Sequence, residues 1–317
     1  MTLNIVPSKR SNLHNTPTVA SGSYADNLAL ASPSPSGRSR GALYPKDDAD
    51  AVKPIVRWAG GKRWLLPVVR SLAAKTSAST LIEPFLGGAA TALGVTSFQS
   101  LDLTDLNSEL VAMYREVRDR PGEVHDAYRY WTNSSEQYYL LRDAEEADPI
   151  LAAARFLYLN HTSFNGIYRV NRQGKYNVPY GRRKALTLPT LDHLQAASKR
   201  LGAAHIAVGD FEESINRANS GTFVFVDPPY TVAHNNNGFI KYNQHLFSFD
   251  DQKRLAGAIE RAVGRGAFFA LTNAAHSSIR ELFGNLGRIV ELDRKNTVGG
   301  LAAGRGRTSE LLFTNVA

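Results

Sequence analysis

From residue 54 onward, the chain alternates short apolar segments with helical ones. The apolar segments are residues 81–85, 100–103, 205–208, 223–226 and 267–271. Strands that alternate with helices in this way are typical of a parallel sheet, because each helix carries the chain back to begin the next strand. The sequence therefore predicts an α/β fold with a doubly wound, mainly parallel sheet and helices on both faces. Ligands of such folds bind beyond the carboxyl ends of the strands.

The alternation stops between residues 110 and 202, where the pattern predicts helices, including 149–159 and 188–201. Residues 160–200 carry eight basic side chains and a single acid, Asp192. A run of charges usually marks a solvated helix face. A run this one-sided, with aromatic residues between the charges, instead favours a surface for nucleic acid. The aromatic residues are Phe164, Tyr168, Tyr176 and Tyr180.

The sequence Asp227-Pro228-Pro229-Tyr230 directly follows the apolar segment 223–226. The two prolines keep the chain extended and remove two backbone donors. A carboxylate, carbonyl groups without neighbouring N–H groups and a flat ring are suited to hold an exocyclic amine and to stack on its heterocycle. The alternative interpretation is a proline pair that merely ends a buried strand, with an ordinary aromatic at the rim.

A glycine turn follows the first predicted strand. Gly87 lets the backbone approach a ligand closely, and the helix expected after the turn supplies free N–H groups. Asp105 comes 22 residues after Glu83, about where a nucleotide-binding fold places the acid for ribose hydroxyls. The glycine spacing is not G-x-G-x-x-G, which argues against a dinucleotide site. Upstream, Lys62 is a candidate partner for a ligand carboxylate, and Trp58 offers a ring face to a cation such as a sulfonium.

Together these elements resemble the N6-adenine DNA methyltransferases of the Dam (D12) type, from about residue 54 to residue 315. The motifs that carry the resemblance are residues 57–62, 83–88, 104–108, 160–181 and 227–230. Ala89 departs from the pattern, since this turn often carries a further Gly or a Gly-Ser pair there.

The resemblance implies a Rossmann-like S-adenosylmethionine-dependent methyltransferase sheet with an inserted, mainly helical DNA-recognition domain. The implied catalytic domain comprises residues 51–112 and 203–317, and the implied recognition domain comprises residues 113–202. The resemblance also implies an antiparallel hairpin of residues 288–292 and 310–314 at the sheet edge.

The cofactor implied by the resemblance is S-adenosyl-L-methionine. The residues implied to bind it are Trp58, Lys62, Glu83, Pro84, Phe85, Gly87, Asp105, Asp210, Phe211 and Asp227. For Asp210 and Phe211, a strand-end cap with a core Phe is an equally good interpretation.

The implied catalytic residues are Asp227, Pro228, Pro229 and Tyr230. Asp227 and the Pro228 carbonyl would accept the two amino hydrogens of a flipped adenine, and Tyr230 would stack on its ring. Methyl transfer would then be direct, with no covalent enzyme intermediate and no metal, because positioning and electrostatics supply the catalysis.

Residues 160–169 match the recognition loop of the family. By that match Phe164 would wedge into the base stack, Asn165 would contact a base edge, and Arg169 would bind a guanine. Further DNA contacts are expected from Lys175, Pro179, Arg182, Arg183 and Lys184, whose cations would bind phosphates. His161 stands where the GATC methylases usually carry Arg, and Arg183 stands where they carry Tyr. GATC is the leading candidate for the recognition sequence.

Composition limits the remaining choices. The chain has no cysteine, which excludes a disulfide scaffold, thiolate zinc sites and the nucleophile of cytosine carbon-5 methylation. No apolar run is long enough to span a bilayer, so we expect a soluble, cytoplasmic protein without a membrane partner. The net charge of +8 indicates an anionic partner. We therefore expect double-stranded DNA as the partner and a monomer in solution. A cognate restriction endonuclease of a restriction-modification system is a candidate second partner.

Residues 1–50 are rich in Ser and Pro and have no sustained apolar period. They are predicted to be a disordered N-terminal tail, with a transit peptide as the alternative. Other functions also stay open. They are an amino-methyltransferase for cytosine N4 or RNA, in which Ser or Asn tends to replace Asp227; a DNA-binding protein with an inactive methyltransferase domain; and a nucleotide-binding oxidoreductase, disfavoured by the glycine spacing.

Overall fold

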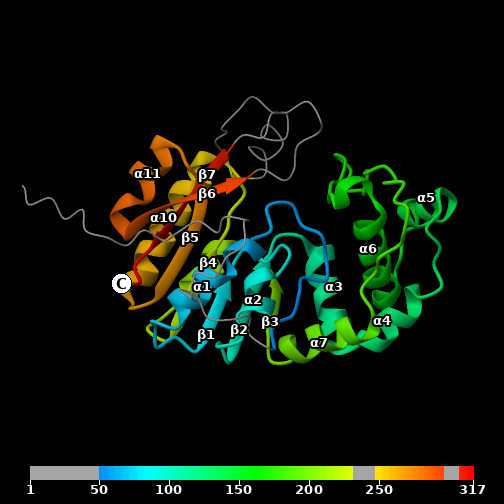
Figure 1. Ribbon diagram of the computed structural model, residues 1–317, viewed down its shortest axis with the longest axis horizontal. Helices are drawn as coiled ribbons and strands as arrows, with labels where there is room; N and C mark the ends of the chain where they lie inside the picture. The colour runs from blue at the N-terminus through cyan, green and yellow to red at the C-terminus, as the bar shows by residue number, and fades with distance from the viewer. Residues whose placement is uncertain (1–49, 231–246, 296–306) are drawn as a thin grey trace, which may run out of the picture. The chain divides into compact units, whose positions relative to one another are not determined.

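The computed structural model describes residues 50–230, 247–295 and 307–317, and a seven-stranded sheet organises them (Figure 1). Its strand order is β3-β2-β1-β4-β5-β7-β6. The strands are β1 (Thr80–Glu83), β2 (Ser100–Asp105), β3 (His205–Val208), β4 (Thr222–Val226), β5 (Phe268–Ala274), β6 (Arg288–Lys295) and β7 (Arg307–Thr314). Neighbours among β1–β5 pair in parallel, and β7 lies antiparallel between β5 and β6. The predicted parallel sheet and edge hairpin are confirmed.

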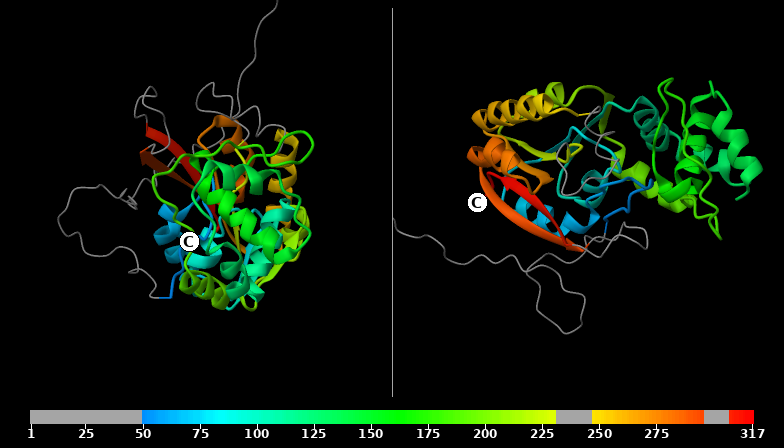
Figure 2. Two further views of the ribbon diagram at one scale, coloured as in Figure 1. Left: turned by 90° about the vertical axis from the view of Figure 1, so that its right-hand side faces the viewer. Right: turned by 90° about the horizontal axis from the view of Figure 1, so that it is seen from above.

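Helices cover both faces of the sheet (Figure 2). They are α1 (Leu66–Ala73), α2 (Ala90–Gly94), α3 (Ser108–Asp119), α4 (Pro121–Tyr128), α5 (Ser135–Asp143), α6 (Pro149–Thr162), α7 (Leu191–Leu201), α8 (Phe211–Asn216), α10 (Phe249–Gly264) and α11 (Ser277–Phe283). Three 3-10 turns accompany them, η1 (Arg63–Leu65), η2 (Phe164–Gly166) and η3 (Gly284–Leu286). Among the described residues, no helix is both long and apolar enough to cross a bilayer.

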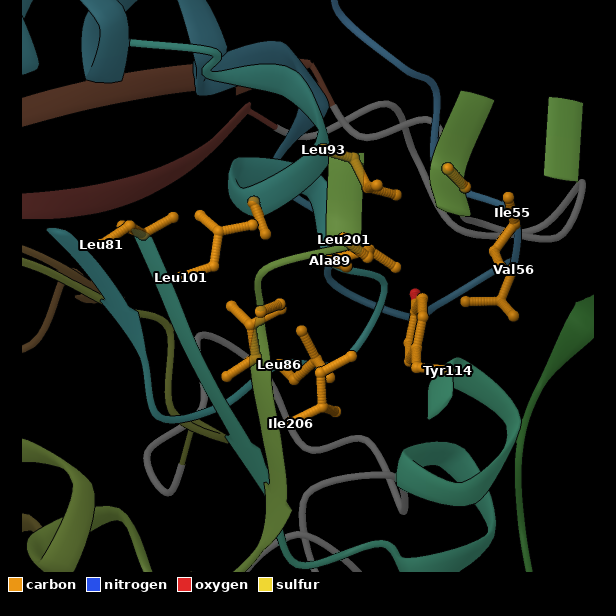
Figure 3. Close-up of a cluster of buried hydrophobic side chains, with 14 of the residues drawn as sticks. Ile55, Val56, Leu81, Leu86, Ala89, Leu93, Leu101, Tyr114, Leu201 and Ile206 are labelled. Carbon is orange, nitrogen blue, oxygen red and sulfur yellow. The ribbon is translucent and has the colours of Figure 1, made fainter. Parts of the chain in front are cut away.

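Strand β4 shows why both faces are covered. Phe223 and Phe225 pack into one core, whereas Val224 and Val226 pack into the other. A strand that is apolar from Phe223 to Val226 needs a cover on each side, as in other parallel sheets. Figure 3 draws part of the first core, which also contains side chains of β1–β3 and of the helices α2, α3 and α7. The second core is closed by α8, α10 and α11.

Between β2 and β3 the chain forms α3 to α7, as expected from the loss of strand rhythm. The predicted helix 149–159 appears as α6, and Asp148 caps its first turn by accepting from the Ile150 and Leu151 N–H groups. Helix α7 begins three residues later than predicted, because the Thr190 side chain accepts from the His193 N–H and so sets the N-terminus. Helices α4, α5 and α6 lie beside the sheet rather than over it (Figures 1 and 2).

A third core of Tyr138, Tyr158, Leu159, Tyr176 and Val178 stabilises this helical part. The predicted domain boundaries near residues 112 and 202 stay a prediction. The predicted tail, residues 1–50, lies outside the described residues except for Asp50.

Candidate functional site

Three acids meet at the carboxyl ends of the central parallel strands, where ligands bind in this class of fold. Glu83 is the last residue of β1, Asp105 is the last residue of β2, and Asp227 directly follows β4. Strand β1 pairs with both β2 and β4, so the three ends are neighbours. The structure therefore brings together the predicted acids from three motifs.

Glu83 and Asp105 bind the backbone of the glycine turn. The Ala92 N–H donates to Glu83 at 3.1 Å, and the Gly87 N–H donates to Asp105 at 2.9 Å. Burial raises the pKa of Glu83 to about 8, although the bond from Ala92 opposes the shift. Burial also raises the pKa of Asp105. The two acids thus fix the shape of the turn that is expected to approach a ligand.

The turn itself has left-handed backbone at two positions. Gly87 has φ of 44° and Ala89 has φ of 53°. Ala89 thus occupies a conformation that glycine adopts with less strain, at the point where the sequence departs from the family pattern. At Gly87 a Cβ atom would lie 2.8 Å from the Trp58 ring. Gly87 is therefore required both by its backbone conformation and by the close approach of Trp58.

Lys62 forms an ion pair with Asp227. Its Nζ is 2.8 Å from Asp227 Oδ1, donates to the Gly60 carbonyl at 2.9 Å, and is 5.1 Å from the centre of the Tyr230 ring. The sequence predicted Lys62 as a partner for a cofactor carboxylate, and that role stays a prediction. The sequence did not predict an ion pair between the motif at residues 57–62 and the motif at residues 227–230.

Two residues that the sequence analysis missed complete the surroundings of Asp227. The Thr272 hydroxyl donates to Asp227 Oδ1 at 2.7 Å, and the Tyr230 hydroxyl donates to Glu310 Oε2 at 2.9 Å. Glu310 Oε2 also lies 3.6 Å from Lys62 Nζ. No motif marks Thr272 or Glu310. The one available signal is polarity at the end of a predicted strand, since Thr272 directly follows the segment 267–271 and Glu310 is the first residue of the segment 310–314.

The electrostatic balance around Asp227 has opposing contributions. Burial raises its pKa, the Lys62 ammonium and the Thr272 hydroxyl lower it, and the Glu310 carboxylate raises it. Burial also raises the pKa of Tyr230 well above its usual range, with Asp227 and Glu310 acting in the same direction. The phenol therefore stays protonated and donates to Glu310, while Asp227 presents acceptor oxygens at the end of β4.

Asp210 and Phe211 make the contacts of a helix cap and a core residue. Asp210 caps α8 by accepting from the Glu212 N–H at 2.9 Å, and it pairs with Arg254 at 2.8 Å. Phe211 stacks on Phe85, with ring centres 5.4 Å apart. These contacts match the interpretation of Asp210 as a cap and Phe211 as a core residue. The cofactor-binding roles expected for Asp210, Phe211 and Phe85 stay predictions. Pro84 is buried between Glu83 and Phe85.

Two exposed apolar side chains at the same edge were also missed. Leu106, which follows Asp105, is 66% exposed, and Val208 at the end of β3 is 48% exposed. Both lie at the carboxyl ends of parallel strands, the edge where ligands bind in this class of fold.

The predicted DNA-binding residues lie mostly on the surface. Phe164 is 53% exposed, and its N–H is held by the Pro179 carbonyl at 2.9 Å. Asn165 is exposed with φ of 56°. The exposed Arg169 donates to Asn177 Oδ1 at 2.8 Å. The backbone of this segment is thus held by the protein, while these side chains face solvent.

The basic residues after Arg169 are not equivalent. Lys175 pairs with the exposed Glu145 at 2.7 Å, and Arg182 and Lys184 are exposed. Arg183 is only half-exposed, and its Nε has no hydrogen-bond partner among the described residues. Arg183 is therefore less exposed to solvent than its basic neighbours Arg182 and Lys184.

Residues 160–168 contact the motif at residues 57–62 directly. The Arg57 N–H donates to the buried Asn160 side chain at 2.7 Å, and the Asn160 amide donates back to the Arg57 carbonyl at 2.8 Å. Trp58 stacks on Tyr168 with ring centres 5.7 Å apart. Since Trp58 also contacts Gly87, it connects the glycine turn to the segment expected to bind DNA.

A family model and several known proteins match this chain in sequence. The family model described as D12 class N6 adenine-specific DNA methyltransferase matches residues 58–298. The type II methyltransferase M1.LlaDCHI of Lactococcus lactis subsp. cremoris is 32% identical over 274 residues, which cover 83% of this chain and 95% of that protein. The DNA adenine methylase of Escherichia coli strain K12 is 32% identical over 237 residues, covering 73% of this chain and 84% of that protein. The DNA N-6-adenine-methyltransferase of Escherichia phage P1 is 36% identical over 253 residues, covering 78% of this chain and 33% of that protein.

Proposed function

Because the chain belongs to the D12 class of N6 adenine-specific DNA methyltransferases, we propose that it methylates adenine at one short sequence in duplex DNA, with GATC as the leading candidate. Membership gives the enzyme class and a family that uses S-adenosylmethionine. The flipping of the base, the roles of the residues and the recognition sequence are our proposals.

The observation that carries the proposal is the placement of Asp227 beside Tyr230. The adenine amino nitrogen is a weak nucleophile, because its lone pair is delocalised into the ring, and in a duplex it is inaccessible. The base therefore leaves the stack. Asp227 and the Pro228 carbonyl accept its two amino hydrogens, which draws the lone pair out of the ring, and Tyr230 stacks on the base. Thr272 holds the Asp227 carboxylate in place.

The chain also offers a site that fits S-adenosylmethionine, which supplies an activated methyl group when it is bound. Trp58 packs against Gly87, where a Cβ atom would collide with the ring, so this glycine lets Trp58 lie against the turn that we expect to contact the cofactor. Asp105 is positioned to accept from ribose hydroxyls, and the exposed Leu106 offers an apolar face to the adenine ring.

The recognition segment supports the choice of GATC in a specific way. The residue expected to bind a guanine, Arg169, is exposed. Of the two departures from the GATC pattern, His161 is half-buried and bonded to the Ile55 carbonyl at 2.8 Å, and Arg183 is half-exposed. Burial lowers the pKa of His161, so its ring is neutral at pH 7. Both departures are thus held partly within the protein, so the proposal of GATC rests on the exposed Arg169 for base recognition.

Modified-base sequencing tests this function. DNA from a host without adenine methylation that expresses the chain is compared with DNA from the same host expressing Asp227→Ala. We expect N6-methyladenine at GATC with the wild-type chain alone. Methylation at another sequence would refute GATC while retaining the activity. A folded, expressed wild-type chain that leaves the DNA unmethylated would refute the proposed function.

A further inference from the structure

Glu310 lies in the reaction site although no motif includes it. It is on β7 and is only 6% exposed. Its Oε2 accepts from the Tyr230 hydroxyl at 2.9 Å and lies 3.6 Å from Lys62 Nζ, which is itself 2.8 Å from Asp227. These four side chains therefore form a continuous array from Tyr230 through Glu310 and Lys62 to Asp227. We name it the four-residue array.

A buried carboxylate at this position is unfavourable for folding alone. Removing a charge from water costs several kcal/mol, and a buried ion pair often stabilises no better than apolar residues of similar size. Leu312, two residues further along β7 and therefore on the same face as Glu310, shows the apolar choice, since it is only 1% exposed. Both partners of Glu310 described above touch the proposed target-base site. This placement indicates a role in the reaction.

The charge of the array explains what Glu310 does. Asp227 Oδ1 already accepts from Thr272 and from Lys62, so its remaining lone pairs must accept the adenine amine. The adenine amino nitrogen gains positive charge during methyl transfer, so a negative charge nearby stabilises it. If Lys62 paired with Asp227 alone, its ammonium would cancel the negative charge of the Asp227 carboxylate. A second carboxylate near Lys62 keeps the array negative overall. The same carboxylate holds the Tyr230 hydroxyl and so fixes the plane of the ring.

We propose that Glu310 is a positioning residue for methyl transfer, which shares the Lys62 ammonium with Asp227 and fixes the Tyr230 ring against the target base. This inference rests on the proposed function. It adds Glu310, a residue of the edge hairpin that lies outside the family motifs in sequence, to the proposed reaction site.

The pH dependence of the reaction separates this role from a purely structural one. The groups that face Asp227 are Lys62, Glu310, Tyr230, Thr272 and, from β1, Glu83, whose pKa is raised in turn by Asp227. Removal of the Glu310 charge lowers the pKa of Asp227, whereas removal of the Lys62 charge raises it. The acid limb of the rate profile should therefore move in opposite directions in the two variants.

The experiment measures single-turnover methylation of a cognate duplex from acid to neutral pH for the full chain, Glu310→Gln and Lys62→Met. Dissociation constants for DNA and S-adenosylmethionine are measured in parallel. We expect Glu310→Gln to lower the plateau rate by about tenfold or more, to keep both dissociation constants within about threefold, and to move the acid limb to lower pH. Lys62→Met should move it to higher pH.

Glu291→Gln is the matched control, because Glu291 is on the neighbouring strand β6 and pairs with Arg280 on the surface. It should match the wild type. Glu310→Asp retains the charge with a shorter reach, so it should lose rate but keep the wild-type acid limb, and it provides the test if Glu310→Gln does not fold. A wild-type plateau and acid limb in Glu310→Gln, or a shift of the limb in Glu310→Asp equal to that in Lys62→Met, would overturn the proposal. Failure of the wild-type chain itself to methylate would count against the proposed function instead.

Discussion

The carboxyl edge of the sheet and the segment 160–184 hold their charged side chains in opposite ways. At the sheet edge, Lys62, Glu83 and Glu310 are 4%, 3% and 6% exposed, respectively, and each is bonded within the protein. In the segment, Arg169 and Lys184 are exposed. If the sheet edge is the reaction site, as we propose, its side chains are already held in place by the protein, whereas the basic side chains of the segment remain accessible to a polyanion.

The two regions should therefore respond differently to substitution. Removing one charge from a buried array unbalances its neighbours, so the effect on chemistry is large. Removing one exposed cation takes away one contact, so the effect on binding is modest. In the segment 160–184, we instead expect substitutions to have large effects where the backbone is held by hydrogen bonds within the protein. One such position is Gly181, whose N–H donates to the Thr162 carbonyl at 2.8 Å.

The largest effect is expected at Asp227. Asp227→Ala should lower kcat by at least about 10³-fold, because the acceptor of the amino hydrogens is lost, while DNA affinity stays near that of the wild type. Asp227→Asn should retain more activity, since its carbonyl oxygen still accepts one hydrogen bond. Steady-state kinetics and DNA binding measure both variants. Near-normal turnover by Asp227→Ala would disprove the assigned mechanism.

A backbone anchor of the segment gives the next largest effect. At Gly181 a Cβ atom would lie 2.5 Å from the Ser163 carbonyl oxygen, so Gly181→Ala must displace residues 181–184. Overpacking of this kind costs about 1–3 kcal/mol, and specific DNA binding should fall while cofactor affinity is unchanged. Gly122→Ala is the control, because a Cβ atom there meets nothing within 4 Å. Equal DNA binding by the two variants would show that the segment tolerates displacement.

Single exposed cations should have smaller and distinguishable effects. If Arg169 binds a guanine, Arg169→Ala costs about 1–3 kcal/mol and relaxes preference at one base position. If Lys184 binds phosphate, Lys184→Ala weakens all duplexes alike and reduces the salt slope by about one unit. Titrations of cognate and single-mismatch duplexes at two salt concentrations separate the cases. A uniform loss in Arg169→Ala would remove its role in base recognition.

The smallest effect concerns stability at the sheet edge. Burial raises the pKa of Glu83 from 4.5 to about 8. Between these values the folded protein binds a proton that the unfolded chain releases, so the free energy of unfolding falls as pH rises. Glu83→Gln keeps an acceptor for the Ala92 N–H and should flatten this decline, which denaturant unfolding at pH 5 and pH 8 measures. Asp105 and Asp227 have the same sign, so some decline persists. Equal slopes in both proteins would contradict the shift.

Much of the fold followed from local pattern. The apolar segments became strands because each is buried on one or both faces, and the acids at their ends met because parallel strands end at one edge. The start of α7 was misplaced at Leu188, although Thr190 is a capping residue type that could have marked the start at Leu191.

The site was less predictable. Lys62 and Asp227 belong to separate motifs, and their ion pair depends on how the strands are ordered. Glu310 reaches the site only because β7 inserts between β5 and β6, an arrangement that no local signal specifies. Arg183 and Lys184 look alike in sequence, yet Lys184 is exposed and Arg183 is only partly exposed, a difference that no local signal specifies.

The most direct test of the central claim is to identify the methylated atom. The purified chain is incubated with methyl-labelled S-adenosylmethionine and a duplex containing GATC, and the DNA is digested to nucleosides for mass spectrometry. We expect labelled N6-methyladenine from the wild-type chain and none from Asp227→Ala. Label on cytosine, or equal labelling of adenine by the two proteins, would contradict the claim that Asp227 at the end of β4 presents the adenine amine for methylation.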